Sequence, residues 1–115
     1  MPYAVNPDAV TQAEQLIRAG QLDRSDSWGK AEPTAKQENT FIAEQGFDAF
    51  ARWHLAVDPD ASPGTKGSLH FPYGDLTQVY RGAVIAAKQR AAQNDHADVE
   101  QAADRLLSLI DKEKA

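Results

Sequence analysis

Cysteine is absent from the 115-residue chain, and methionine occurs only once. The lack of cysteine excludes disulfide bonds, thiol catalysis and cysteine-based zinc sites, and it is typical of proteins in a reducing compartment. No apolar run approaches the roughly 20 residues that cross a bilayer, and the first residues lack the basic and then apolar layout of a secretory signal. We therefore expect a cytoplasmic protein with no membrane partner, stabilised by packing alone.

Charge of one sign does not dominate either, since 12 basic residues oppose 17 acidic ones for a formal net charge of -5. Residues 64–94 are the exception, with four basic residues against one acidic residue. An acidic protein repels a polyanion overall, whereas a local basic face can still bind phosphate. The charge pattern therefore disfavours nucleic acid as a partner and keeps it as an alternative.

The length of the chain is typical of one domain, so we expect residues 1–115 to share a single hydrophobic core. Near the start, Asn6 is a favoured helix cap, and Pro7 suits a first helical turn because its missing N–H costs nothing there. Gly20 is a typical helix end. These signals predict an amphipathic helix over residues 7–19.

Residues 21–31 show no sustained period and are expected to form a loop, with Trp28 turned into the core. The next segment begins with Thr34, which stands three residues before Gln37. This is the spacing of a capping box, in which the two side chains satisfy the first backbone donors of a helix. It predicts a second helix over residues 35–45.

Residues 47–57 fit two periods at once. Their apolar side chains alternate as in a strand, and part of the segment also has helical spacing. We expect a strand over residues 50–57, because a turn-rich stretch ends it sharply and a second alternating run follows at residues 68–73. Pro72 in that run favours an edge position. If residues 47–57 were instead helical, the fold would be an all-α bundle.

The C-terminal part has the pattern of two antiparallel helices, over residues 76–93 and 96–112. Asp75 and Asp95 precede these ranges and are expected to cap them. The predicted fold class is therefore α+β: a small single domain with N-terminal helices, one antiparallel β-hairpin and a C-terminal antiparallel helix pair.

Enzyme signatures are missing from the chain. It has no glycine-rich phosphate loop, no nucleophile elbow and no paired-histidine zinc motif. His54 and His70 are expected on the polar face of the hairpin, where they could meet as an acid/base or ligand pair with Asp58 or Asp75. Two surface histidines are the simpler interpretation. We therefore predict no catalytic residues, no metal and no cofactor, and keep a small metal-dependent or hydrolytic enzyme as an alternative.

One cluster combines aromatic and basic side chains that could hold a partner's side chains or stack on bases. The candidate binding residues are Trp53, His54, Lys66, His70, Tyr73 and Arg81. In the competing interpretation Trp53 and Phe71 only fill the core, while residues 73–75 only form a turn and a cap. Even then we expect Tyr73, Lys66 and Arg81 on one exposed rim.

The motif Trp53-His54-Leu55, then Thr65-Lys66, then Phe71-Pro72-Tyr73-Gly74-Asp75, resembles a family of small uncharacterised bacterial proteins. The resemblance runs from about Gln37 to the last helix. More loosely, the layout is similar to a segment attached to tailed-phage prohead proteases and head-morphogenesis proteins. The nucleophile and histidine of those proteases have no matching positions here. The resemblance implies a phage-related accessory module without protease activity.

We therefore predict a non-enzymatic protein-binding module, phage- or prophage-related, that uses the polar face of the hairpin and the start of the following helix. Its partner would be an unidentified protein, and the sequence leaves the oligomeric state open. The nucleic-acid alternative would use Lys66, Arg81, Lys88 and Arg90 with Tyr73. Because Arg90 is turned by about 180° from Arg81 on a helix, that basic stripe is incomplete.

Overall fold

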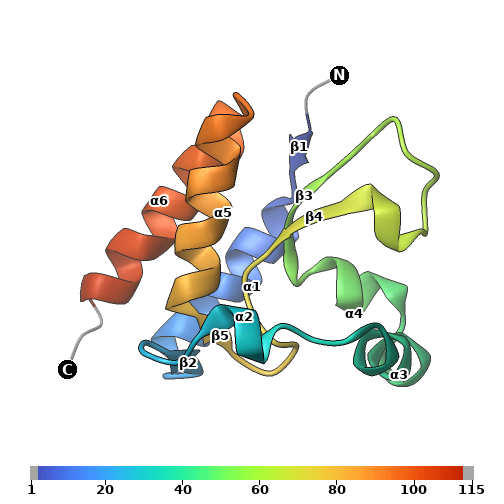
Figure 1. The fold of residues 1–115 in the computed structure, drawn as a ribbon, viewed down its shortest axis with the longest axis horizontal. Helices are drawn as coiled ribbons and strands as arrows, with labels where there is room; N and C mark the ends of the chain where they lie inside the picture. The colour runs from blue at the N-terminus through green and yellow to red at the C-terminus, as the bar shows by residue number, and fades with distance from the viewer. Residues whose placement is uncertain (1–2, 113–115) are drawn as a thin grey trace.

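The computed structural model describes residues 3–112 and has an α+β fold with a small antiparallel sheet (Figure 1). The elements in chain order are β1 (Ala4–Val5), α1 (Pro7–Arg18), β2 (Leu22–Asp23), α2 (Trp28–Ala31), α3 (Ala35–Gln45), α4 (Phe47–Ala51), β3 (His54–Val57), a 3-10 turn (Lys66–Ser68), β4 (Leu69–Pro72), β5 (Val79–Tyr80), α5 (Arg81–Gln93) and α6 (Ala97–Lys112).

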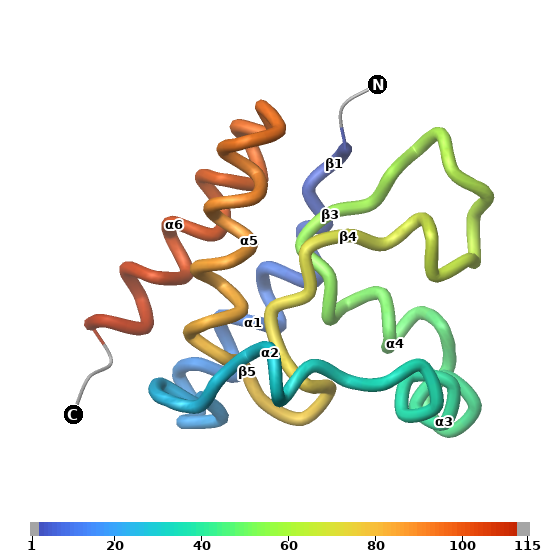
Figure 2. Tube along the Cα trace, viewed as in Figure 1, coloured from blue at the N-terminus to red at the C-terminus, as the bar shows by residue number. Residues whose placement is uncertain are grey.

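The sheet has the strand order β1-β3-β4, and a separate parallel pair joins β2 to β5. Helices α1, α5 and α6 pack on this sheet, and the two C-terminal helices form an antiparallel pair along one side of the molecule (Figure 1). On the other side α3 packs on α4. Figure 2 shows the chain passing from α4 through β3, around a long loop and back along β4. The sheet therefore stands between a large helical layer and a small one.

Helix α1 confirms the predicted N-terminal helix, ending one residue early at Arg18. Asn6 occupies the cap position with an extended backbone, but its side chain makes no capping hydrogen bond. Its Nδ2 instead donates to the carbonyl of Ala51 at 3.1 Å. The capping role predicted for the Asn6 side chain is therefore wrong, because a carbonyl of α4 lies within reach of its donor.

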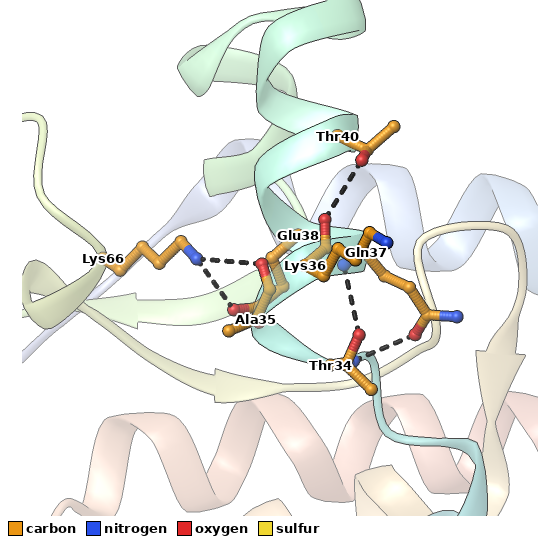
Figure 3. Close-up of polar contacts among 7 residues, drawn as sticks. All are labelled: Thr34, Ala35, Lys36, Gln37, Glu38, Thr40 and Lys66. Carbon is orange, nitrogen blue, oxygen red and sulfur yellow. Dashed lines mark hydrogen bonds and ion pairs between the residues drawn. The ribbon is translucent and has the colours of Figure 1, made fainter.

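Helix α3 has the predicted bounds and the predicted capping box. Gln37 N donates to the Thr34 hydroxyl at 3.1 Å, and Thr34 N donates to the Gln37 side chain at 2.9 Å (Figure 3). These two bonds satisfy donors that the first helical turn leaves free. Sequence-local chemistry accounts for where this helix begins.

The predicted strand over residues 50–57 is only half right. Its first part belongs to α4, and β3 begins at His54. The helical spacing prevails because Phe50 is fully buried and its ring contacts those of Phe41 and Phe47. The hairpin itself is confirmed, since β3 pairs antiparallel with β4 in a register that places His54 opposite Pro72.

The helix predicted from residue 76 begins later, at Arg81. Asp75 does not cap it. Its carboxylate accepts hydrogen bonds from the backbone N–H groups of Thr77 and Gln78, at 3.0 and 2.9 Å, and so closes a tight turn. Val79 then pairs with β2. Both β2 and α2 are in residues 21–31, the segment predicted to be a loop. Trp28 opens α2 and is half-buried, with its ring 5.6 Å from that of Tyr80.

The last helix is confirmed to within one residue, but Asp95 is not its cap. Asp95 has a left-handed backbone, with φ of 60°, and lies two residues before the first helical residue, Ala97. The His96 N–H donates back to the Ala91 carbonyl at 2.8 Å, so the turn is closed by the end of α5. The buried stripe of α6 consists of Val99, Ala102, Ala103, Leu106 and Ile110.

Candidate functional site

Two of the predicted binding residues, Trp53 and Tyr73, lie in the core. Tyr73 is fully buried, and its ring stacks on that of Trp53 at 5.2 Å. Its hydroxyl donates to the Arg52 carbonyl at 2.8 Å and accepts from Gln12 at 2.9 Å. Burial raises the pKa of this hydroxyl. The expectation of an exposed Tyr73 is therefore wrong, because the hydroxyl finds partners inside the fold.

The neighbouring Gly74 explains why the motif at residues 71–75 is so compact. A Cβ at this position would lie 2.7 Å from the Trp53 ring and closer still to the Gln78 carbonyl. Only glycine lets the two strands of this turn approach so closely. The tyrosine, glycine and aspartate of the motif thus have structural roles. The competing interpretation was right about the turn and wrong about the cap, because Asp75 closes the turn and does not cap α5.

His54 and His70 share one face of the sheet, as predicted, because His54 lies opposite Pro72 and His70 opposite Ala56. However, His54 is buried, and its Nδ1 donates to the Phe50 carbonyl at 3.0 Å. Burial lowers the pKa of His54 to about 4, against the opposing effect of that hydrogen bond. It is therefore a neutral core side chain at pH 7 rather than a surface histidine.

His70 belongs instead to a stack of three rings. Tyr3 lies between the imidazoles of His70 and His96, with centroid distances of 4.2 and 4.5 Å and nearly parallel planes. Neither Tyr3 nor His96 belongs to a periodic pattern or a motif, so the sequence does not point to either residue. No group of three metal-ligating side chains occurs within residues 3–112.

Three of the four basic side chains named for the nucleic-acid alternative are paired within the chain. Lys66 Nζ lies 3.3 Å from a Glu38 carboxylate oxygen and donates to the Ala35 carbonyl at 3.5 Å (Figure 3). Arg81 pairs with Asp111 at 3.3 Å, and Lys88 pairs with Asp104 at 2.7 Å. These pairs reduce the positive charge that the nucleic-acid alternative requires.

The described residues form several shallow hollows, and we call one of them the β4–α5 groove. It has a volume of about 360 Å³ and lies between α2, β4 and α5. Its lining includes Trp28, His70, Pro72, Ala83, Ala86 and Arg90. Small alanine side chains from α5 form one wall, and the half-buried Trp28 forms another. Of the predicted binding residues, only His70 lines this groove.

Two charged residues of opposite sign, Arg90 and Glu32, line the groove. Arg90 is exposed and makes no ion pair with any of residues 3–112. Glu32, on the α2 side, is also exposed. The groove therefore offers an available cation beside an apolar wall, which suits an apolar group next to a carboxylate.

Comparison of this chain with models of protein families, with curated proteins and with solved structures found no match. Among residues 3–112, no helix has the length and apolar character needed to cross a membrane.

Proposed function

We propose that this chain is a non-enzymatic protein-binding domain that holds a short peptide segment of another protein in the β4–α5 groove. The observation that carries the proposal is the unpaired Arg90 beside an apolar wall of alanines and Trp28. Interfaces concentrate their binding energy in tryptophan, tyrosine and arginine side chains set in such concave sites. The groove supplies two of these residue types.

The groove is supported on its α2 side by packing that limits movement of Trp28. The Trp28 ring contacts Tyr80, which is buried. A Cβ at Gly82 would lie 3.4 Å from the Cβ of Trp28, so α2 sits directly on the start of α5. A wall that is already ordered loses little side-chain entropy when a peptide binds.

The preferred occupant is a segment with a small apolar or planar side chain followed by an acidic residue or a terminal carboxylate. The apolar side chain would lie against Ala83 and Ala86, and the carboxylate would pair with Arg90. A segment rich in basic residues is disfavoured at the Arg90 end by like-charge repulsion.

A selection from a displayed random-peptide library on the purified chain tests this proposal. We expect the selected peptides to bind the Ala86→Gln variant at least about tenfold more weakly, because the longer side chain fills the groove. Ala92→Gln is the matched control, since Ala92 is exposed on α5 and does not line the groove. Arg90→Glu should weaken binding of the acidic peptides further. Equal binding to wild type and Ala86→Gln would refute the groove as the binding site.

The looser similarity in layout between this chain and a segment attached to phage head proteins supports placing the domain among phage- or prophage-borne accessory proteins. Its abundance in a native host should then rise when a resident prophage is induced. Quantitative proteomics before and after induction checks this, and an unchanged abundance while capsid proteins rise would contradict it.

A further inference from the structure

A second hollow shares no lining residue with the β4–α5 groove. We call it the α1–α4 hollow, because α1, α3 and α4 border it together with the turn before β5. Its lining includes Gln12, Gln15, Phe41, Arg52, Trp53 and Leu76. Its volume is about 450 Å³, within the range of roughly 300–1,000 Å³ that is typical of small-molecule sites. Peptide binding in the groove therefore does not account for this hollow.

The floor of the α1–α4 hollow is apolar. The Trp53 ring is buried there, while Leu16, Phe41 and Leu76 are half-buried side chains that pack on the core. Each of these half-buried side chains leaves part of its apolar surface exposed to solvent. A ligand with an apolar body would remove that surface from water, which is favourable in proportion to the area covered.

Leu76 has an unusual backbone conformation for a residue with a large side chain. Its φ is 75°, in the left-handed region that favours glycine. The turn that holds it is closed by the Asp75 carboxylate, which accepts from the N–H groups of Thr77 and Gln78. Residues kept in such costly conformations are concentrated at ligand-binding sites. In this turn, the leucine side chain lines the hollow, where a glycine would leave a gap.

Arg52 is the one charged residue in the lining of the hollow. Its side chain is exposed and makes no ion pair with any of residues 3–112. The other polar groups of the lining are glutamine amides, which carry no charge. The hollow therefore combines a single available cation with an apolar floor, and the ligand that complements both has a carboxylate and an apolar body.

The guanidinium of Arg52 is positioned by a chain of hydrogen bonds that starts in the core. Its Nε donates to Gln12 Oε1 at 3.3 Å, and Gln12 Nε2 donates to the Tyr73 hydroxyl at 2.9 Å. Tyr73 is fully buried and also donates to the Arg52 carbonyl at 2.8 Å. Because Nε is already engaged, Nη1 and Nη2 remain for a bidentate contact with a carboxylate. A guanidinium held in this way loses less entropy when a ligand binds.

We propose that the α1–α4 hollow binds a small carboxylic acid with an aromatic or branched apolar body. The carboxylate pairs with Nη1 and Nη2 of Arg52, and the apolar body lies against Phe41, Trp53 and Leu76. A free amino acid is disfavoured, since no carboxylate lines the hollow to pair with its ammonium group. The proposal is independent of peptide binding in the β4–α5 groove.

Titration of the purified chain with phenylbutyrate, followed by NMR, tests the proposal. The Trp53 indole N–H and the Gln12 side-chain amide should shift, while the backbone amides of Ala86 and Arg90 in the groove should not. Phenylbutyrate should bind at least about tenfold more tightly than phenylbutyramide, which lacks the charge, and than butyrate, which lacks the ring. Equal binding of phenylbutyrate and phenylbutyramide, or shifts confined to Ala86 and Arg90, would overturn the proposal.

Two variants with one control locate the ligand. Arg52→Gln should weaken phenylbutyrate binding at least about tenfold and leave phenylbutyramide unaffected. Leu76→Asn keeps a residue that tolerates the left-handed backbone but removes the apolar wall, so both probes should bind at least about threefold more weakly. Arg18→Gln is the matched control, because Arg18 is exposed on α1 and does not line the hollow.

The control separates a site from a general effect of charge. If Arg18→Gln and Arg52→Gln weakened phenylbutyrate binding equally, the probe would respond only to the net charge of the chain, and the proposal would be rejected. Undiminished phenylbutyrate binding by Arg52→Gln would reject it as well. Backbone amide spectra that match wild type outside the hollow establish that each variant is folded.

Discussion

Helices α3 and α6 differ in what holds them in place. Helix α3 has a complete capping box, yet none of its residues is buried, and its main neighbour is α4. Helix α6 begins after a turn whose aspartate does not cap it, yet it buries five side chains against α1, α5 and the sheet. Local signals are therefore strongest where burial is weakest. Stability of the fold should depend on α6 and only slightly on α3.

The same substitution in the two helices should give the largest contrast. Ile110→Ala should lower the unfolding free energy by about 4 kcal/mol, because Ile110 is fully buried and its removal leaves a cavity. Ile42→Ala in α3 should cost about 1 kcal/mol or less, since that side chain is only half-buried. Urea denaturation of both variants checks this, and equal losses would remove the distinction between the two helices.

Lowering the pH should destabilise the sheet through His54 and leave the capping box of α3 unchanged. The pKa of His54 in the folded state is about 4, below the value of about 6.5 in an unfolded chain. As the pH falls, the unfolded chain therefore binds this proton at a higher pH than the folded chain does. The contribution of neutral His54 to the unfolding free energy is complete above about pH 6.5 and is lost as the pH falls toward 4. The loss should be on the order of 3 kcal/mol.

Comparison with His54→Asn isolates this contribution, because the asparagine amide can still donate to the Phe50 carbonyl but does not titrate. The difference in unfolding free energy between wild type and variant should shrink by that amount between pH 7 and pH 4. A pH-independent difference would mean that His54 is not buried in its neutral form.

Gly74→Ala tests the tight turn that precedes α5. The added methyl group would meet the Gln78 carbonyl and the Trp53 ring, so the turn must shift. We expect a loss of about 2 kcal/mol in unfolding free energy. Gly67→Ala is the matched control, since a Cβ there meets nothing within 4 Å. Equal stability of the two variants would show that the turn can open at little cost.

The smallest effect should come from the cap of α3. Thr34→Ala removes the hydroxyl that accepts from the Gln37 N–H and should cost about 1 kcal/mol or less. Exchange of amides in the first turn of α3 should increase more than exchange in α6. Thr34→Ser retains the hydroxyl and should behave as wild type. If α6 amides lost protection equally, the two helices would unfold as one unit.

The parts of the fold that sequence predicts well have either a long amphipathic period or a local cap. Helix α6 illustrates the first case and the Thr34 capping box the second. The errors fall where tertiary contacts override a local pattern. Phe50 joins a helix because it packs on two other rings, and Asp75 caps a turn because Val79 is needed for pairing with β2.

The candidate sites were only partly predictable. His70 was found from strand alternation, but its partners Tyr3 and His96 are distant in sequence and carry no motif. Trp28 was expected in the core and is half-buried, where it lines the groove. Arg90 was noted only as a misfit in a basic stripe. Arg90 stands out only once the ion pairs of Lys66, Arg81 and Lys88 are known, and those pairs are visible only in the three-dimensional structure.

The parallel pairing of β2 with β5 also bears on the order in which the chain folds. Leu22 lies beside Val79, so this contact closes a loop that contains about half of the chain. Closing a long loop costs chain entropy and is therefore slow, whereas α5 and α6 meet across a short turn. The C-terminal helices should therefore form first and provide the surface on which α1 and the sheet assemble. The β2–β5 contact would then be among the last to form.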